Sequence, residues 1–512
     1  MKELNKDNKI RNWNRISLLI LALLVAVQGL LLYQVWSLHM LPTQYFLLLC
    51  AACLVITGLL GLLLRQRKLG EWQKKASWGK QIIGIMLSIV ILAGCLVGSG
   101  AVGRVLGTIG AITAPQKVNV VLEVYVRSDD PAECIEDTDS YSYAMSDDIP
   151  QEVSAKMCSE LEAHFGHPVQ IRTYPGSVAA VDALLTGEAD ALILDTAYLM
   201  VFEDMEGYGD VESRIRVLHE YVVEKEVVQN NWLPLPQKPE KVDVTEKPFL
   251  VYISGNDARR ELLADGGSDV NILVVVNPED HQILLLNTPR DYYVVNPASG
   301  DGSRDKLSHC GLHGIDNCVG AMEELYGIPI DYYARINFSG FRTLIDAIGG
   351  VTVYSDKAFT AGDVNIRYGE NHLNGDQALK FARERKNLRG GDNDRGKNQM
   401  KLISAMIDQL SVGNLISNYS EILKSLEGMF ATSMSAEDIG KLVQFQLTEA
   451  PSWDVKSFAV TGDNGNDTCW AKGGGKGYVM YPHDYMVEQA KDLLTRALAG
   501  EVLTDEDLLV NQ

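Results

Sequence analysis

The stretch FLVYISGNDARRELLADGGSDVNILVVV at 249–276 decides the fold of the carboxyl-terminal half of this 512-residue chain. Its two ends, FLVYIS and NILVVV, are near-continuous apolar runs, and a third run, ILLLNT, follows at 283–288. Strands that are buried on both faces have this pattern. The NPEDHQ between the second and third runs predicts a hairpin turn. We therefore expect neighbouring strands of one buried sheet.

Helical and strand-like segments alternate beyond these runs. AMEELYGI at 321–328 and FRTLIDAIGG at 341–350 are typical of helices, and Gly349 is expected to close the second. DYYARINF at 331–338 and VTVYS at 351–355 are typical of strands. The alternation predicts an α/β domain over 249–500, with a central sheet flanked by helices. An acidic tail is expected to follow at 501–512.

Charged residues stand at the ends of the three runs. Asp257 follows the first run, Asp269 precedes the second, and Arg290 lies just past the third. Ligands of α/β sheets bind beyond strand ends, so neighbouring strands would bring these side chains together. Carboxylates are the ligands that a hard divalent cation prefers. Asp257 and Asp269 are therefore the predicted metal ligands.

A second charged cluster is ALKFARERKNLRGGDNDRGKNQM at 378–400. Asn374 and Gln377 form a capping-box pattern, which predicts a helix start just before this cluster. Arg383 and Arg385 are two residues apart, so they share a face only if the chain is extended there.

The end of this cluster predicts another helix. Gly390 and Gly391 predict a turn, and Asp392 is expected to cap a helix on which Arg395 and Gln399 share one face. Guanidinium groups match phosphate oxygens bidentately. The predicted pyrophosphate-binding residues are Arg290, Arg383, Arg385, Arg395 and Gln399. The ordinary alternative for such a charge run is a solvated helix surface.

Other polar features indicate less. GGGKG at 473–477 lacks the Lys-Ser/Thr ending of a phosphate-binding P-loop and is interpreted as a turn. His309 and His313 are interpreted as structural histidines rather than ligands.

Three long apolar segments occupy the amino-terminal part: Ile16–Trp36, Tyr45–Leu64 and Ile82–Val102. Each is near the about 20 residues that span a bilayer as a helix. We expect a membrane region with three transmembrane helices over 16–105, preceded by a cytoplasmic segment at 1–15.

Flanking charge predicts the orientation of these helices. The loop between the first two, SLHMLPT, has no Lys or Arg, whereas basic residues precede the first segment and fill the second loop at 65–80. Basic loops stay in the cytoplasm, so three crossings put the bulk of the chain outside the cell. The net charge of −21 argues against a nucleic-acid partner.

Residues 117–228 are expected to form an accessory α/β domain outside the membrane. VNVVLEVYV, VQIRTY and ADALILD are typical of strands, and QEVSAKMCSELEAHF and SVAAVDALLTG are typical of helices. This alternation predicts a parallel sheet. The run at 179–199 resembles a piece of the periplasmic solute-binding fold, so a ligand-binding lobe and a generic packing domain are the two interpretations. A proline-rich linker follows at 229–248.

The cysteines permit disulfides but set no connectivity. Three of the eight lie in the apolar segments. Among the external ones, Cys310 with Cys318 and Cys134 with Cys158 are candidate pairs, and one cysteine is left over.

These motifs together resemble the LytR-CpsA-Psr family, which attaches glycopolymers to bacterial cell walls. The resemblance covers about 248–500. It rests on the two spaced aspartates, on TPRD at 288–291, on R-x-R, D-x-x-R and the following Gln, and on KLSH at 306–309, YYARINFSGF at 332–341 and DAIGGVTV at 346–353. Two positions depart from the family pattern. Gly267 stands where the family usually has Arg, with Arg259 or Arg260 as possible substitutes, and Asn398, next to Lys397, stands where Arg usually precedes the Gln.

The resemblance implies a membrane-anchored phosphotransferase. Such an enzyme moves an anionic glycopolymer, such as a teichoic acid or capsule polymer, from a polyprenyl-pyrophosphate lipid to a hydroxyl of peptidoglycan. It implies Mg²⁺ or Mn²⁺ on Asp257 and Asp269, and catalytic roles for Arg290, Asp392 and Arg395. Asp392 either orients Arg395 or acts as the base. The apolar strands and the Met/Leu-rich helix are expected to enclose the lipid tail. The alternatives are a pyrophosphatase acting on the same lipid, and a non-enzymatic extracellular sensor whose receptor part is 117–228.

Overall fold

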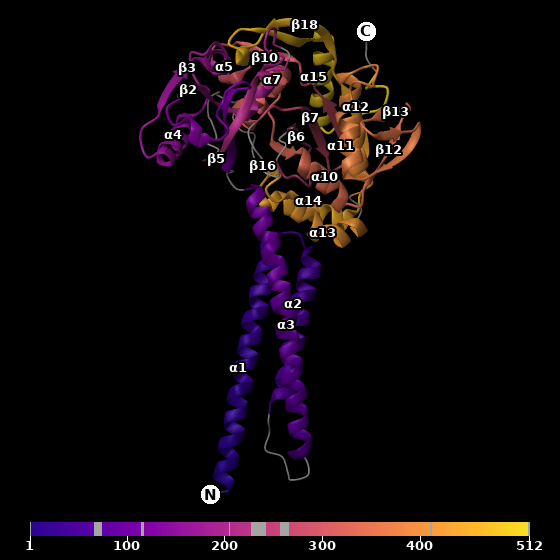
Figure 1. Ribbon diagram of the computed structural model, residues 1–512. Coiled ribbons are helices and arrows are strands. Elements are labelled where there is room, and N and C mark those ends of the chain that lie inside the picture. The colour runs from indigo at the N-terminus through magenta and orange to yellow at the C-terminus, as the bar shows by residue number, and fades with distance from the viewer. Residues whose placement is uncertain are drawn as a thin grey trace. The chain divides into compact units, whose positions relative to one another are not determined.

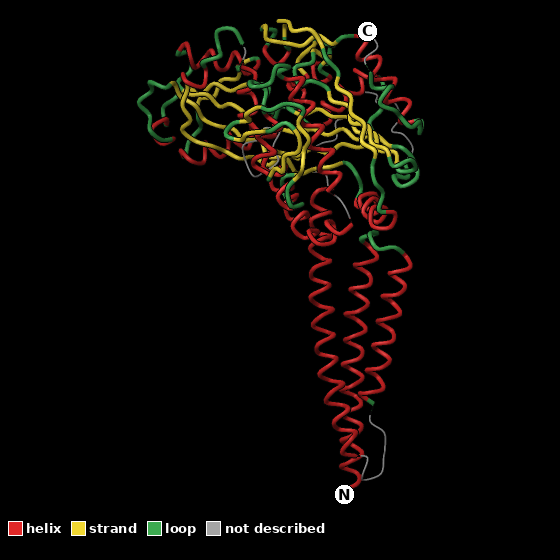
Figure 2. Tube along the Cα trace, turned by 90° about the vertical axis from the view of Figure 1, so that its right-hand side faces the viewer, coloured by secondary structure: helices red, strands yellow, loops and turns green. Residues whose placement is uncertain are grey.

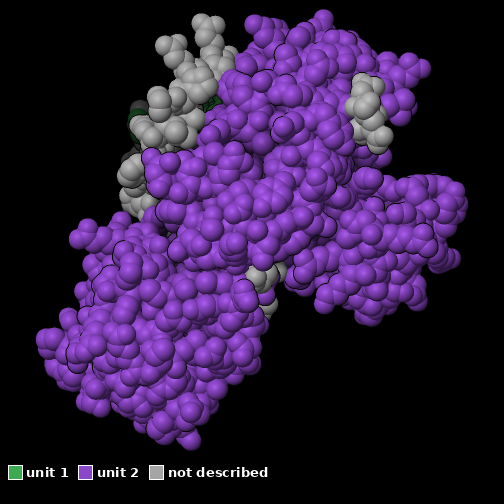
Figure 3. Space-filling view, turned by 90° about the horizontal axis from the view of Figure 1, so that it is seen from above, with its two compact units in different colours: residues 1–110, 435–450 green, residues 111–434, 451–512 purple. Residues whose placement is uncertain are grey.

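The computed structural model describes residues 2–65, 74–113, 117–203, 205–226, 242–256, 266–409 and 412–509. The chain divides into two compact units, which are coloured separately in Figure 3. Unit 1 comprises residues 1–110 and 435–450, and unit 2 comprises 111–434 and 451–512.

Three long helices make up most of unit 1: α1 (Lys2–Ser37), α2 (Thr43–Leu64) and α3 (Lys74–Thr113). They run side by side in both views (Figures 1 and 2). The stretches Asn12–Ser37, Thr43–Leu64 and Gly79–Thr113 are long and apolar enough to cross a membrane. The prediction of three apolar membrane helices is confirmed.

The surface of these helices suits a lipid environment. Large apolar side chains point outward, among them Leu54, which is 75% exposed, and Val97, which is 73% exposed. Polar side chains instead pair between helices. Thr57 donates to Gln28 over 2.8 Å, and Ser99 donates to Gln34 over 2.6 Å. Polar contacts of this kind hold helices together where the surroundings are apolar.

Unit 1 also contains α14 (Ala436–Glu449), which comes from within the predicted carboxyl-terminal domain. The Ser435 side chain caps this helix by accepting from the backbone N–H of Asp438 over 3.1 Å. Gly440 lies directly against the backbone carbonyl of Leu38 in the α1–α2 turn, where a Cβ would collide with it. A segment far along the chain thus packs with the turn between the first two apolar helices.

The accessory domain is a five-stranded sheet of order β3-β2-β4-β1-β5. Its strands are β1 (Lys117–Arg127), β2 (Ser142–Ser146), β3 (Gln170–Tyr174), β4 (Ala191–Asp195) and β5 (Ile215–Glu226). Helix α4 (Gln151–Phe165) packs on one buried face, and α5 (Gly176–Thr186) packs on the other. Gly187 ends α5 with φ of 78°, a conformation that glycine adopts without strain.

The prediction of a parallel sheet here is correct for only part of the domain. β2 is parallel to β3 and β4. β1 is antiparallel to both β4 and β5, because the long strand β5, which we did not predict, returns along the whole length of β1. Short elements follow β4 and precede β5: the 3-10 helix η3 (Thr196–Tyr198), α6 (Leu199–Phe202) and α7 (Val211–Arg214).

The carboxyl-terminal domain is built on a six-stranded mixed sheet of order β16-β11-β6-β7-β8-β17. These strands are β6 (Phe249–Asn256), β7 (Val270–Asn277), β8 (Gln282–Asn287), β11 (Tyr332–Asn337), β16 (Phe430–Thr432) and β17 (Asp454–Ala459). β6, β7 and β8 are antiparallel neighbours, so the predicted hairpin at 277–282 is confirmed. β11 is parallel to β6, and β17 is parallel to β8.

Helices cover both faces of this sheet, as predicted. α9 (Ile315–Tyr326) and α15 (Asp484–Leu498) bury one face, and α12 (Asp392–Gln409) lies on the other. Beside α12 lie α10 (Phe338–Ala347) and α11 (Gly375–Arg383), which share a third cluster of buried side chains with it. Gly349 follows α10 with φ of 87°, at the predicted end of this helix.

The predicted strand VTVYS forms outside the central sheet. It is β12 (Val351–Ser355), and it pairs with β15 (Gly369–Leu373) in a separate two-stranded sheet. The remaining elements lie outside the two main sheets: β9 (Tyr293–Val295), β10 (Arg304–Lys306), α8 (Leu307–Cys310), β13 (Phe359–Ala361), β14 (Val364–Ile366), α13 (Val412–Leu426), β18 (Gly462–Thr468), β19 (Lys476–Pro482) and the 3-10 helices η2 (Ile135–Thr138), η4 (Pro297–Ser299), η5 (Gly311–His313) and η6 (Trp470–Lys472).

The acidic segment after residue 500 packs against the carboxyl-terminal domain. Leu503 is buried, and its backbone N–H and carbonyl both bond to the side chain of Gln282. Asp507 pairs with Arg496 of α15 over 2.8 Å. This segment is therefore part of the domain's fold through residue 509.

None of the eight cysteines, all of which lie among the described residues, forms a disulfide. The candidate disulfides Cys310–Cys318 and Cys134–Cys158 are therefore not formed. Cys310 and Cys318 instead lie in the main apolar core, where they pack as small hydrophobic side chains.

Candidate active site

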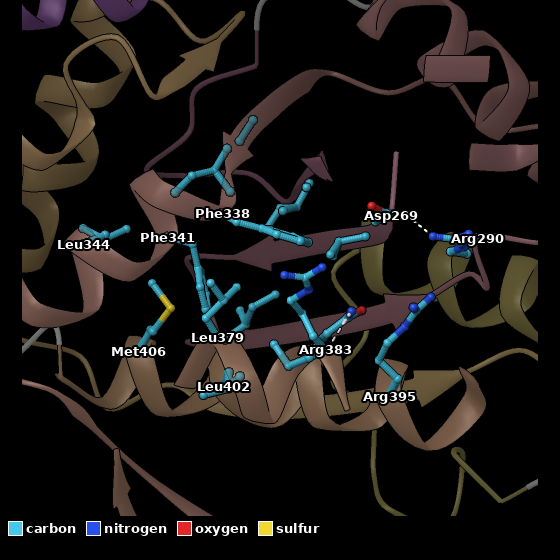
Figure 4. A pocket seen from close by; sticks show the side chains of 18 of the residues that line it. Asp269, Arg290, Phe338, Phe341, Leu344, Leu379, Arg383, Arg395, Leu402 and Met406 are labelled. Atoms are coloured by element: carbon cyan, nitrogen blue, oxygen red, sulfur yellow. Dashed lines mark hydrogen bonds and ion pairs between the residues drawn. The ribbon is translucent and has the colours of Figure 1, made fainter. Parts of the chain in front are cut away.

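A cavity of about 410 Å³ opens between the central sheet and the helices α10, α11 and α12. One end is apolar and the other is charged (Figure 4). The apolar end is lined by Phe338, Phe341, Leu344, Leu379, Leu402 and Met406. The charged end is lined by Glu203, Asp269, Arg290, Arg385 and Arg395, and Arg383 projects between the two ends. A pocket of this size and composition fits an amphiphilic ligand.

The strand ends bring the first charged cluster together. The backbone N–H of Asp269 donates to the carbonyl of Gly255 over 2.8 Å, which joins the end of β6 to the start of β7. Arg290 follows β8, and its Nη1 donates to the Asp269 carboxylate. The structure thus places Asp269 and Arg290 in contact. Asp257 lies outside the described residues, as do Arg259 and Arg260.

The second cluster approaches from α11. The predicted capping box is present, since Asn374 and Gln377 each bond the other's backbone N–H. Arg383 is the last helical residue, and the backbone becomes extended at Glu384, with φ of −65° and ψ of 127°. This break lets Arg383 and Arg385 both reach the cavity. The Arg383 guanidinium also lies over the ring of Phe338, 4.9 Å from its centroid.

Helix α12 supplies the third side of the charged end. It begins one residue earlier than predicted, because Asp392 is its first helical residue rather than its N-cap, and the Asp392 carboxylate forms an ion pair with Arg395. Arg395 and Gln399 are each 8% exposed and both line the cavity. Gln399 donates from Nε2 to the carbonyl of Ala382 over 3.3 Å, which ties α12 to the end of α11.

Burial and neighbouring charges shift the pKa values of Arg290 and Asp392 at the charged end. Burial lowers the pKa of Arg290, but the negative charges of Asp269, then Asp291 and Asp392, outweigh this effect and raise it. Arg290 is therefore a permanent cation. Burial raises the pKa of Asp392, and the positive charge of Arg395 opposes the shift. Asp392 therefore accepts a proton more readily than an exposed aspartate.

The KLSH segment at 306–309 contacts the site through Lys306, which lies beside Asp291. Lys306 is buried, and its ammonium lies 3.6 Å from Asp291, the neighbour of Arg290. The His309 Nδ1 and the Asp305 carboxylate are 2.6 Å apart, and both residues are buried. His313 packs against aromatic rings. Both histidines thus have partners within the fold, and neither lines the cavity.

Two contributions to the site were missed by sequence reasoning. Glu203, from the accessory domain, lines the cavity with its carboxylate 3.9 Å from Arg290. Met200 of the same domain fills the space above Gly267, where a Cβ would lie 2.5 Å from the Met200 Cε. No local sequence signal marks either residue, because both reach the site only through the packing of one domain on the other.

The chemistry of the charged end is compatible with a divalent cation. Asp269 presents carboxylate oxygens inside the cavity, and hard cations prefer such oxygen ligands. Among the residues that the structure describes, no three His, Cys, Asp or Glu side chains are grouped as a metal site. The second predicted ligand, Asp257, lies outside these residues.

Comparison with protein families decides the assignment of the chain. The model of the LytR_cpsA_psr family matches residues 221–491. The chain belongs to the LytR-CpsA-Psr family. The matched range contains the positions Asp257, Asp269 and Arg290 at the strand ends, the Arg383–Arg385 segment and all of α12.

Two curated relatives are similar to this LytR-CpsA-Psr chain. The polyisoprenyl-teichoic acid–peptidoglycan teichoic acid transferase TagU of Enterococcus faecalis is 34% identical over 211 residues, which cover 40% of this chain and 68% of the relative. The transferase of the same name from Bacillus anthracis is 30% identical over 233 residues, covering 45% of this chain and 73% of the relative.

Two solved structures are similar to the carboxyl-terminal half of the chain. B. subtilis TagV is 26% identical, with coverage of 50% of this chain and 99% of that chain and a TM-score of 0.42. A structure described as TagT bound to LIIa-WTA is 27% identical, with coverage of 51% and 94% and a TM-score of 0.42.

Proposed function

We propose that this chain is a membrane-anchored transferase that moves a glycopolymer from a polyprenyl-pyrophosphate lipid to peptidoglycan. The observation that carries the proposal is one cavity that joins an apolar end to four arginines. A lipid tail fits the first part and a pyrophosphate fits the second. Family membership and relatives named as teichoic acid transferases support the same reaction class.

The apolar and charged ends of the cavity would fix the orientation of the lipid pyrophosphate donor. The tail would lie among Phe341, Leu344 and Met406, and the lipid-side phosphate would meet Arg383. The polymer-side phosphate would then lie between Arg290 and Arg395, next to Asp269. Bidentate guanidinium contacts orient both phosphates.

In the proposed reaction, a hydroxyl of peptidoglycan attacks the polymer-side phosphorus. A phosphodiester forms, the P–O–P bond breaks, and the lipid leaves as its monophosphate. The catalytic need is charge neutralisation along the reaction path rather than a protein nucleophile. Arg290 and Arg395 supply it from this chain, and Asp392 orients Arg395 through their ion pair. Mg²⁺ or Mn²⁺ on Asp257 and Asp269 would add further charge neutralisation.

The site is proposed to face the outside of the cell. Basic residues cluster in the first turns of α1, before its apolar stretch, and over residues 65–80, which join α2 to the apolar part of α3, whereas the α1–α2 loop has none. The positive-inside rule then puts the residues after α3 outside, where peptidoglycan is found.

A transfer assay tests the proposal. The full chain in detergent micelles is mixed with a lipid pyrophosphate that carries a labelled glycopolymer, with Mg²⁺ and with peptidoglycan. We expect label to become attached to peptidoglycan while lipid monophosphate is released. Release of lipid monophosphate with no attached label would show a pyrophosphatase. If neither attached label nor lipid monophosphate is formed, the remaining interpretation is an extracellular sensor.

A further inference from the structure

The segment after β4, which comprises η3, α6 and Glu203, packs on the carboxyl-terminal domain at the edge of the cavity. The ring of Tyr198 meets His313 edge to face, with centroids 6.4 Å apart, and the His313 ring is tilted against Trp470, with centroids 4.9 Å apart. Leu312 is 6% exposed and belongs to the same buried cluster as Val201 and Phe202. The core of the accessory domain therefore extends into the carboxyl-terminal domain, and α6 is fixed by apolar packing.

Glu203 follows α6 directly and is one of three carboxylates around the Arg290 guanidinium. Asp269 contacts Nη1, Asp291 lies 3.6 Å from Nε, and Glu203 lies 3.9 Å from Nη2. The Asp269 and Asp291 side chains are 14% and 7% exposed. The Glu203 side chain is 60% exposed, so it is the one of the three that is free to move when a ligand arrives.

The accessory domain is strongly acidic, and Glu203 is its acidic residue that lines the cavity. Residues 117–226 contain 24 acidic and seven basic residues, a formal charge of −17 out of −21 for the chain. Position 267 is glycine and contributes no side chain, and Met200 of the accessory domain occupies the space where a side chain would begin. The accessory domain thus supplies the carboxylate of Glu203 beside Arg290, one of the guanidinium groups that would hold a phosphate.

We propose that Glu203 is a specificity-determining residue of the cavity, whose carboxylate competes with the polymer-side phosphate of a lipid pyrophosphate for Arg290. The inference rests on the proposed function. Arg383 lies nearer the apolar side chains and Arg290 lies at the opposite end of the cavity (Figure 4), so a ligand with its tail in the apolar end would bring its first phosphate to Arg383 and only its second to Arg290. Binding of the second phosphate displaces Glu203, and the return of Glu203 favours release of the transferred group.

The competition predicts a change that depends on the ligand. In Glu203→Gln the carboxylate charge is lost while the shape is kept, so geranylgeranyl pyrophosphate should bind more tightly. Exposed ion pairs are weak, so we expect about a threefold decrease in Kd. Geranylgeranyl monophosphate, which has no second phosphate, should bind with an unchanged Kd. Glu203→Asp keeps the charge and should stay close to wild type for both ligands.

Glu206→Gln is the matched control, since Glu206 is an exposed acid three residues further along that does not line the cavity. Calorimetric titration of the full chain in detergent micelles with Mg²⁺ gives both Kd values. Equal tightening of both ligands in Glu203→Gln, or the same tightening in Glu206→Gln, would show a general field effect and overturn the proposal.

The titration also separates this inference from the proposed function. If wild-type protein binds the pyrophosphate and Glu203→Gln binds it with the same Kd, only the role of Glu203 is wrong. If wild-type protein does not bind the pyrophosphate, the proposed function is wrong and the role of Glu203 is wrong with it.

Discussion

The guanidinium of Arg290 donates to the carboxylate of Asp269 at the charged end of the cavity. The two residues come from different strand ends, and both side chains are largely buried, at 16% and 14% exposed. This pair links the predicted metal ligand to the predicted phosphate ligand. A change at Asp269 should therefore affect both cation and phosphate binding.

The first prediction concerns the metal. Asp269→Asn should abolish polymer transfer, because it removes a charged oxygen ligand from the cation and the partner of Arg290. The wild-type protein should lose transfer in excess EDTA and regain it on addition of Mg²⁺ or Mn²⁺. Transfer is measured as label attached to peptidoglycan. Asp363→Asn, which alters an exposed ion pair with Lys380, is the control and should retain activity.

Full transfer by the wild-type protein in excess EDTA would contradict a metal-dependent mechanism. An unfolded Asp269→Asn variant would not decide the question, so its melting temperature is measured beside that of the wild type. The EDTA experiment needs no variant and decides the metal prediction by itself.

The arginines should be sensitive to the geometry of their side chains as well as to their charge. Arg383→Lys keeps the charge but loses the planar fork and the stacking on Phe338. Loss of one preorganised charge-stabilising contact typically costs about 100-fold in rate, and we expect a decrease of that order in kcat/KM for transfer. Arg342→Lys is the control, because Arg342 forms an exposed ion pair with Asp376. Near wild-type transfer by Arg383→Lys would mean that this arginine does not bind the donor.

The apolar end predicts a dependence on the length of the lipid tail. Met406→Trp should fill part of the space beside Phe341 and Leu344. KM should rise for donors with long prenyl chains and change less for donors with short chains, because only the long chains need this space. Asp408→Trp adds the same bulk at an exposed position of α12 and serves as the control. Equal KM changes for both chain lengths would show that the tail binds elsewhere.

Acid sensitivity of the fold should arise partly from the buried pair Asp305–His309. Burial alone would raise the pKa of Asp305, but the charge of His309, the hydrogen bond with it and the backbone N–H of Ala471 outweigh burial and lower it. A carboxyl with a lowered pKa in the folded state stabilises the fold above its unfolded pKa. This stabilisation is lost as the pH falls below the ordinary value of 3.8.

Asp305→Asn should therefore melt at a lower temperature near neutral pH, since removing one partner of a buried pair costs about 3 kcal/mol. The difference from wild type should shrink as the pH is lowered through 3.8. Melting temperatures measured between neutral pH and pH about 3 check both parts. A difference that stays constant over this range would show that the charge of Asp305 does not contribute.

The sequence predicted the parts of the site that depend on local patterns. Apolar runs located β6, β7 and β8, and the capping box at Asn374 located the start of α11. Helix periodicity predicted that Arg395 and Gln399 share one face of α12, and both line the cavity.

The features that were missed depend on contacts between distant segments. β5 was not expected, and its pairing with β1 made the accessory sheet mixed. VTVYS has the local pattern of a sheet strand, but its partner β15 is itself remote from the central sheet. Glu203 reaches the cavity, and Met200 reaches Gly267, only because α6 docks on the loops around Leu312 and Trp470. Local propensity carries no information about such docking.

The contact between Met200 and Gly267 gives a final prediction. Gly267→Arg alone should destabilise the packing of α6, because the new side chain must displace the Met200 thioether. Overpacking of this kind typically costs about 1–3 kcal/mol. In the double variant Met200→Ala with Gly267→Arg, the shortened side chain leaves room, so the cost of Gly267→Arg should be smaller than in the wild-type background.

A double-mutant cycle on the free energy of unfolding measures this coupling, which should exceed about 0.5 kcal/mol for residues in contact. Val178→Ala with Gly267→Arg is the control cycle, since Val178 is packed against the same core but does not contact Gly267. Simple additivity of Met200→Ala and Gly267→Arg would show that Met200 does not occupy the space above Gly267. The packing of the accessory domain on the site would then need another explanation, and the placement of Glu203 beside Arg290 would lose its structural basis.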